Sequence, residues 1–185
     1  MTPPGVRLIG DPVLRARATE VGNVDEPAFL EESRVLLEAL EDFRARHGFG
    51  RAIAAPQIGV SKRFIAVDLG QGPFLVIDPV VTWRSEETFT LWDDCMSFPW
   101  LMVRLRRHRS ISLSYTEAGG DRRPWDRLDL AASELMQHEL DHLDGVLAVD
   151  RAEDRAALLA RELFEGDRER FAAEVDYTIP PPTGP

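Results

Sequence analysis

The stretch QHELDHLDG (residues 137–145) places two histidines four positions apart, with an acid directly after the first. On an α-helix, residues four apart lie on one face, with Cβ atoms about 5–6 Å apart. His138 and His142 can therefore bind one metal ion together, and Glu139 would lie near an open coordination position of that ion. The sequence thus predicts a metal-binding helix, which we expect at the centre of the fold.

The same letters have an alternative interpretation, a solvated helix face with ion pairs between positions i and i+4. The metal-binding interpretation is favoured because the flanking residues of the helix are apolar and can anchor it in a core. These residues are Leu135, Met136, Leu140 and Leu143.

A catalytic metal normally has three protein ligands and one open position, so a third ligand must come from outside this helix. The candidates are Cys95, His47, His108 and a distant acid. His47 and His108 lie in the charged stretches RARHG and RRHRS, which are typical of solvent-facing segments. Cys95 follows two acids in DDCMSFP, although a lone cysteine is usually a small buried hydrophobic residue. The residues alone leave the choice open.

Apolar residues at helical spacing predict helices over residues 25–50, 130–143 and 153–175. Asp25 and Asp129 are candidate N-caps of the first two helices, and Gly48 and Gly145 are candidate ends. The third helix is charged, and we expect a break near Gly166.

Strand patterns follow one another between the first two helices. They cover residues 63–68, 74–78, 80–92 and 109–121, and Gly119–Gly120 then turns the chain into a partner strand near Trp125. This order predicts an α+β fold with antiparallel or mixed sheets. We expect one catalytic domain over residues 1–175 and a proline-rich, disordered tail over residues 176–185.

Length and charge narrow the function class. The chain has 185 residues, a net charge of −10 and a pI of about 4.9, which argue against nucleic acid or anionic lipid as the main ligand. No apolar run is long enough to predict a membrane span, and the N-terminus does not resemble a signal peptide. A single cysteine cannot form an internal disulfide, so a reducing, cytoplasmic location is expected.

Three segments together make the sequence recognisable. They are GRAIAAPQIG (50–59), DDCMS (93–97) and QHELDH (137–142), supported by GDPVLR (10–15) and HLDGVLAVDR (142–151). In this order the sequence resembles the peptide deformylases over about residues 8–151. The last motif alone is shared with many zinc peptidases, whereas glutamine, cysteine and His-Glu-x-x-His in this order are far more specific.

The resemblance implies a metallo-hydrolase that removes the N-formyl group from N-formylmethionyl peptides of newly made proteins. It implies that one divalent ion, Fe²⁺ first and Zn²⁺, Ni²⁺ or Co²⁺ in purified protein, is held by Cys95, His138 and His142. Glu139 would act as general base, and the Gln57 amide with the Met96 backbone N–H would stabilise the oxyanion.

The substrate groove departs from the family pattern at two glycine positions, which are Ala52 and Asp94 here. The resemblance implies that Arg51, Ala52 and Ile53 pair with the substrate backbone and that Asp94 lies in the opposite wall. An added methyl and a carboxylate would narrow and polarise that groove, because glycine permits close backbone approach.

Two further acids have expected partners. Asp93 replaces the glutamate of the family motif, and we expect it to pair with Arg104 or Arg106. Asp141 is either a surface acid or a residue that orients a ligand or a nearby arginine.

The departures leave the substrate less certain than the chemistry. The expected ligand is an N-formylated peptide or a small formamide. The alternatives are an amidase acting on another N-formyl or N-acyl amine, and a weakly active metal-binding homologue. Intact Glu139 and Gln57 speak against the last, because a pure scaffold needs no general base. The acidic chain gives no support for ribosome association.

Overall fold

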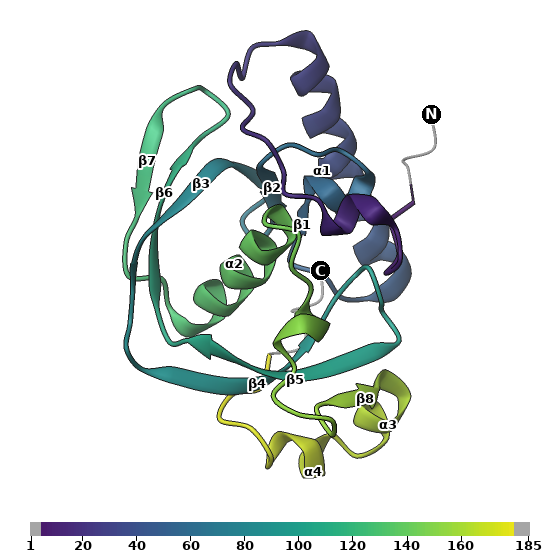
Figure 1. Cartoon of the computed structure of the whole chain (residues 1–185). Helices are drawn as coiled ribbons and strands as arrows, with labels where there is room; N and C mark the ends of the chain where they lie inside the picture. Colours follow the sequence, from purple (N-terminus) through teal and green to yellow (C-terminus); the bar gives the residue numbers. More distant parts are fainter. Residues whose placement is uncertain (1–4, 180–185) are drawn as a thin grey trace.

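The computed structural model describes residues 5–179 and contains two antiparallel sheets (Figure 1). The first has the strand order β1-β2-β3-β6-β7, and the second has the order β4-β5-β8. The first sheet comprises β1 (Ala52–Ala54), β2 (Phe64–Val67), β3 (Phe74–Arg84), β6 (Ile111–Thr116) and β7 (Arg122–Trp125). The second comprises β4 (Thr88–Asp94), β5 (Leu101–His108) and β8 (Leu158–Ala160). The predicted α+β class is confirmed.

Within residues 5–179, four α-helices and three short 3₁₀ segments complete the fold. The helices are α1 (Pro27–His47), α2 (Leu130–Leu143), α3 (Arg161–Gly166) and α4 (Arg168–Ala172). The 3₁₀ segments are η1 (Pro12–Arg15), η2 (Ala55–Ile58) and η3 (Ala148–Arg151). Over residues 5–179, none of the helices has the length and apolar character needed to cross a membrane.

Helix α2 has the predicted bounds and lies at the centre of the molecule between the two sheets (Figure 1). Asp129 caps its start, since its carboxylate accepts a hydrogen bond of 2.8 Å from the Ala132 amide. Gly145 follows its end with a left-handed φ of 74°, a conformation that glycine adopts without steric cost. The segment 138–142 is therefore carried by a helix that is fixed at both of its ends.

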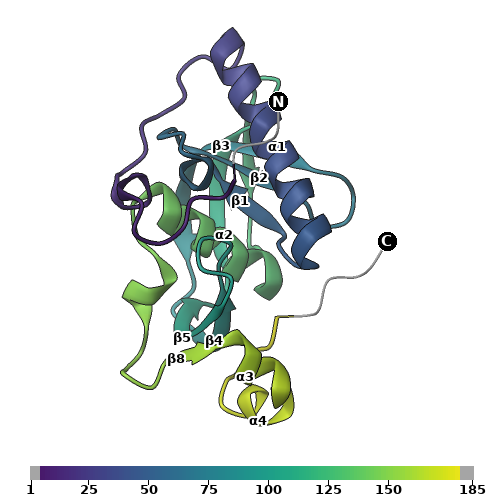
Figure 2. The ribbon, with the colours of Figure 1, turned by 90° about the vertical axis from the view of Figure 1, so that its right-hand side faces the viewer.

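The edge strand β1 separates the two halves of the core. Side chains alternate across a strand, so Ala52 and Ala54 pack toward α2, whereas Ile53 packs among Leu36 and Leu40 of α1. Helix α1 thus covers one face of the first sheet, and α2 covers the other (Figure 2). This sandwich fixes the distance between β1 and α2, which together bound the site described below.

The predicted strands are found with adjusted bounds. The β-rich stretch 80–92 is divided between the end of β3 and β4, and the turn at Gly119–Gly120 leads into β7 as predicted. Strand β5 is absent from the sequence prediction, although it pairs with β4 along its whole length.

The prediction of a helix over residues 153–175 is wrong for the first third of that segment. Residues Leu158–Ala160 instead form β8, which pairs with Leu101–Val103 of β5. The free edge of β5 offers backbone hydrogen bonds that outweigh the helical propensity of this segment. The remaining helix is broken at Asp167, next to the predicted Gly166, where φ is −149° and ψ is 58°.

Helix α1 begins two residues later than its predicted cap. Glu26 occupies the N-cap position and makes no capping hydrogen bond, while Asp25 lies outside the helix. Pro27 takes the first helical position, which suits a residue with fixed φ and no N–H. The predicted end at Gly48 is confirmed by its left-handed φ of 70°.

The chain returns to the second sheet after α4. The amide of Tyr177 donates to the carbonyl of Thr90 at 3.1 Å, and the Asp176 carboxylate accepts from the Thr90 amide at 2.9 Å. Residues 176–179, expected to begin a disordered tail, are thus held along β4. Residues 180–185 of that expected tail lie outside the described residues.

Candidate active site

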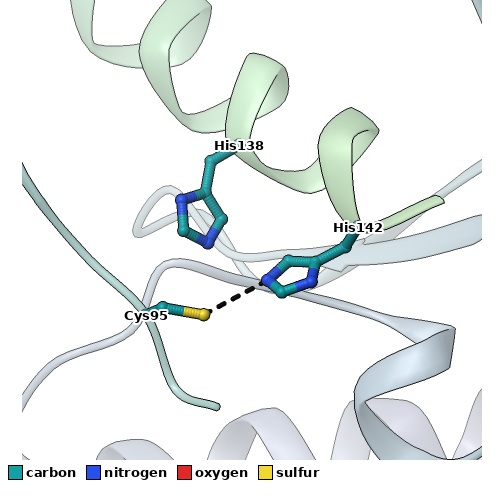
Figure 3. A group of neighbouring side chains, drawn as sticks. All are labelled: Cys95, His138 and His142. Carbon is teal, nitrogen blue, oxygen red and sulfur yellow. Dashed lines mark hydrogen bonds between the residues drawn. The ribbon is translucent and has the colours of Figure 1, made fainter. Parts of the chain in front are cut away.

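Three side chains that could hold a metal ion meet between α2 and the end of β4 (Figure 3). His138 and His142 come from successive turns of α2, and Cys95 comes from the residue that follows β4. Their ligand atoms all lie within 4.8 Å of one another, and Cys95 Sγ lies 3.2 Å from His142 Nε2. All three side chains are buried. Of the four candidates for a third ligand, the structure brings Cys95 to the two histidines.

The donor set fits one divalent ion. One thiolate and two imidazoles are ligands that iron, zinc, nickel and cobalt all accept. His138 Nδ1 donates to the Asp93 carboxylate at 2.9 Å, which leaves Nε2 free to face the cluster. The thiol and the two imidazoles are thus close enough to share one ion.

The second layer around the cluster is ionic and buried. Burial acts to raise the pKa of Asp93, but His138 and Arg107 outweigh it and lower this pKa to about 2. Burial acts to lower the pKa of His138, but the Asp93 carboxylate holds it well above its ordinary value. Burial and the nearby charge of His138 hold the pKa of His142 well below its ordinary value. Asp93 therefore stays ionised and orients the His138 ring.

The expected partner of Asp93 is corrected from Arg104 or Arg106 to Arg107, whose Nη2 lies 3.1 Å from the carboxylate. Side chains alternate along β5, so Arg107 points inward, while Arg104 and Arg106 point to the opposite face. There Arg104 and Arg106 pair with acids of the C-terminal third, including Glu153.

Asp141 is the second acid on Arg107. It is buried, and its carboxylate accepts from both Arg107 and Arg151. Of the two expectations for Asp141, the surface acid is wrong and the pairing with arginine is confirmed. The chain Asp93–Arg107–Asp141–Arg151 ties α2 to β4, β5 and η3.

Glu139 faces the cluster from α2. Its side chain is 3% exposed, and its Oε2 has no hydrogen-bond partner among residues 5–179. Burial raises the pKa of Glu139 to about 7. A buried, unpartnered carboxyl oxygen with such a pKa is poised to exchange a proton near neutral pH.

Gln57 lies in η2 and is fixed at both ends of its amide. Its Oε1 accepts from the Ala54 amide at 2.8 Å, which turns Nε2 toward Ser97 Oγ at 3.3 Å and Cys95 Sγ at 3.9 Å. Ser97 is a contact that the sequence analysis does not anticipate. The orientation of the donor amide is therefore set by the fold before any ligand binds.

Met96 packs beneath the glycine that opens the first motif. Gly50 has a φ of 108°, and a Cβ at this position would collide with the Met96 side chain. The positive φ is what favours glycine here, since the Met96 contact involves the flexible end of that side chain. Met96, like Gln57, lines the cavity beside the cluster.

A cavity of about 410 Å³ opens next to the cluster. Strands β1 and β4 bound it, and each is the edge strand of its sheet on this side. Ala52 and Asp94 line the cavity as expected, whereas the fully buried Ile53 side chain does not reach it. Any contact of Ile53 with a ligand is therefore restricted to its main chain.

The charge at Asp94 is compensated in a way that the sequence analysis misses. Its carboxylate accepts from Arg161 Nη2 at 2.7 Å, and the same guanidinium lies 4.1 Å from the centre of the Phe49 ring. Arg161 therefore offsets the charge that Asp94 brings to the cavity wall.

A second ion pair also lines the cavity. The Arg51 guanidinium donates to the Glu134 carboxylate and, through Nη1, to the Ala131 carbonyl at 3.2 Å. The expected site residue Arg51 is thus present, with its side chain turned to α2. Burial raises the pKa of Glu134 to about 7, although Arg51 acts against this rise. Glu134 belongs to none of the sequence motifs, so its place in the cavity wall was not predicted.

Comparison with known proteins agrees with these features. A sequence model described as polypeptide deformylase matches residues 4–157. The peptide deformylase of Thermotoga neapolitana is 37% identical over 157 residues, which cover 85% of this chain and 92% of that protein. The peptide deformylase of Synechocystis is 34% identical over 168 residues, which cover 87% of this chain and 85% of that protein.

Solved structures show the same similarity. The peptide deformylase of Thermotoga maritima superposes with a TM-score of 0.71 at 37% identity, over 80% of this chain and 97% of that one. The peptide deformylase of Synechococcus elongatus, solved with actinonin, superposes with a TM-score of 0.77 at 29% identity, over 94% of this chain and 90% of that one. By sequence and by fold, this chain belongs to the polypeptide deformylase family.

Proposed function

We propose that the chain is a metal-dependent hydrolase that removes the N-formyl group from N-formylmethionyl peptides of newly made proteins. The observation that carries this proposal is the convergence of Cys95, His138 and His142 beside the unpartnered Glu139 carboxylate in an open cavity. Family membership supplies the reaction class. The proposed compartment is the cytoplasm, where nascent formylated chains are made.

When bound by the three ligands, a divalent ion supplies Lewis acidity toward water and toward the formyl carbonyl. Glu139 is proposed to accept the proton of the attacking water and to return it to the leaving amine. Its burial supports this role, because a carboxyl whose pKa is near neutrality can both take and give a proton.

The oxyanion that develops on the formyl oxygen needs donors already in place. The Gln57 amide is proposed as one donor, since its other end is held by the Ala54 amide. The Met96 backbone N–H is proposed as the second, because it follows Cys95 directly at the cavity wall.

The peptide is proposed to bind in extended form between β1 and β4. Each strand has an edge on the cavity, and an extended peptide can add main-chain hydrogen bonds to such an edge. The main chain of residues 51–53 would form one wall, and that of Asp94 the other. Tyr177 already pairs with β4 at Leu91. The peptide is therefore proposed to pair with the part of β4 that lies closer to Cys95.

The metal is proposed to be Fe²⁺, as the family resemblance implies, with Ni²⁺, Co²⁺ and Zn²⁺ able to occupy the same donors. Protein loaded with Fe²⁺ without oxygen should lose activity on exposure to air, whereas Ni²⁺-loaded protein should keep it. Equal air stability of both forms would argue against iron as the working metal.

The function is tested by measuring formate release from formyl-Met-Ala-Ser with anaerobically loaded protein, one ion per chain. One formate per peptide cleaved, with an unformylated peptide inert, is the expected result. Unrelated formamides test the alternative that another N-formyl amine is the substrate. A fully loaded protein that releases no formate from any of them would leave only the interpretation of a weakly active metal-binding homologue.

A further inference from the structure

The Arg51–Glu134 ion pair lies where the first side chain of a substrate must pass. Glu134 precedes His138 by one helical turn on α2, so their Cβ atoms are about 5–6 Å apart. In a formylated peptide, the side chain of the first residue begins at its Cβ, three bonds and roughly 3–4 Å from the formyl carbon. A formyl carbon held beside His138 therefore brings that side chain into reach of the pair.

This part of the cavity wall is polar. Arg51 and Glu134 both line the cavity, and the Arg51 side chain keeps 24% of its surface exposed while that of Glu134 keeps 1%. The exposed part of this pair thus belongs to Arg51. Two of its N–H groups are engaged, by the Ala131 carbonyl and the Glu134 carboxylate, within residues 5–179. The remaining N–H groups can donate to a ligand.

The C-terminal segment adds a second donor to the same region. Tyr177 lines the cavity, and its hydroxyl is buried without a hydrogen-bond partner among the described residues. Burial and the charge of Glu134 raise its pKa, so the hydroxyl keeps its proton and remains a donor. Buried hydroxyls are nearly always hydrogen-bonded in folded proteins, and a bound ligand would supply the missing acceptor.

The two donors prefer an uncharged acceptor. The carboxylates of Glu134 and Asp129 also line this part of the cavity and would repel an anionic side chain. An apolar side chain such as that of methionine would cover the guanidinium and the hydroxyl and leave both donors without an acceptor. An amide oxygen or a hydroxyl would accept a hydrogen bond from them directly.

We propose that Arg51, paired with Glu134, and Tyr177 make this cavity select N-formylated substrates whose first side chain carries an uncharged hydrogen-bond acceptor, such as an amide, over methionine. This inference rests on the proposed deformylase reaction and departs from its methionyl substrate in the first side chain alone; if the selectivity fails, N-formylmethionyl peptides remain the proposed substrate. The aliphatic stem of Arg51 could alternatively serve as an apolar wall, and the two interpretations predict opposite substrate preferences.

The test compares formyl-Gln-Ala-Ser with formyl-norleucine-Ala-Ser and formyl-Met-Ala-Ser, whose first side chains have similar length. In the metal-loaded wild type, kcat/KM for the glutamine peptide should exceed that for the norleucine peptide by about tenfold, the equivalent of one hydrogen bond. Arg51→Leu with Glu134→Leu should reverse this order. Both residues are changed together because one alone would leave a buried unpaired charge. Tyr177→Phe should lower the ratio without reversing it.

The matched control is Glu32→Leu with Lys62→Leu, which removes a partly buried ion pair outside the cavity. Its ratio should equal that of the wild type. A wild type that favours norleucine or methionine overturns the inference, whether or not the double variant folds. An unchanged ratio in a folded Arg51/Glu134 double variant overturns it as well.

Affinity separates this inference from the proposed activity. In the Glu139→Gln background, the dissociation constants of the same three peptides should show the same order as kcat/KM. If no peptide releases formate but the glutamine peptide binds most tightly, the proposed activity fails and the selectivity stands. If the norleucine peptide binds most tightly, the selectivity is wrong.

Discussion

Replacing Arg107 by methionine tests the buried network that orients His138. Arg107 is 4% exposed and lies between the carboxylates of Asp93 and Asp141. Methionine keeps much of the length of the side chain and removes its charge. Breaking a buried ion pair by removing one partner typically costs about 3–5 kcal/mol, because it leaves an uncompensated charge. Asp93 retains His138 and Asp141 retains Arg151, so we expect the lower end, about 3 kcal/mol.

The loss is measured as the free energy of unfolding in urea, followed by tryptophan fluorescence at equal metal loading. Arg106→Met is the matched control, since it removes the same group one position away on β5. The Arg106 side chain is 53% exposed and pairs with Glu153, so its loss should cost at most about 1 kcal/mol. A loss for Arg107→Met no larger than that for Arg106→Met would refute the assignment of Arg107 to a stabilising network.

Three further substitutions address the chemistry. Cys95→Ala removes one of three ligands and should lower metal content sharply, as measured by mass spectrometry; full occupancy in this variant would exclude Cys95 from the site. Glu139→Gln keeps the size of the side chain and removes the proton acceptor, so metal should be retained while turnover falls by several orders of magnitude; activity within about tenfold of the wild type would place the proton elsewhere. Gln57→Leu should lower kcat about 10²–10³-fold with metal unchanged, and an unaltered kcat would assign the oxyanion to other donors.

The central helix could be predicted from sequence because all of its signals are local. The cap at Asp129, the apolar face and the glycine at position 145 lie within one short segment, and each acts through near neighbours. The antiparallel class followed from contiguous strand patterns in the same way. The metal cluster needed one long-range contact, that of Cys95, which only the family motif supplied.

The errors arose where tertiary contacts decide the outcome. Residues 158–160 have a helical pattern, and their pairing with β5 depends on an edge that the local sequence does not reveal. The partner of Asp93 could have been predicted, since Val103, Leu105 and Arg107 share one face of a strand, but β5 itself was absent from the prediction. Glu134 and Tyr177 carry no motif, and only the fold brings them to the cavity.

The central claim is that Cys95, His138 and His142 hold one divalent ion. X-ray absorption of the zinc-loaded protein measures these ligands directly. The claim predicts one sulfur neighbour at about 2.3 Å and two imidazole nitrogens at about 2.0–2.1 Å, with the sulfur lost in Cys95→Ala. A first coordination shell made only of nitrogen and oxygen, at full occupancy in the wild type, would contradict it.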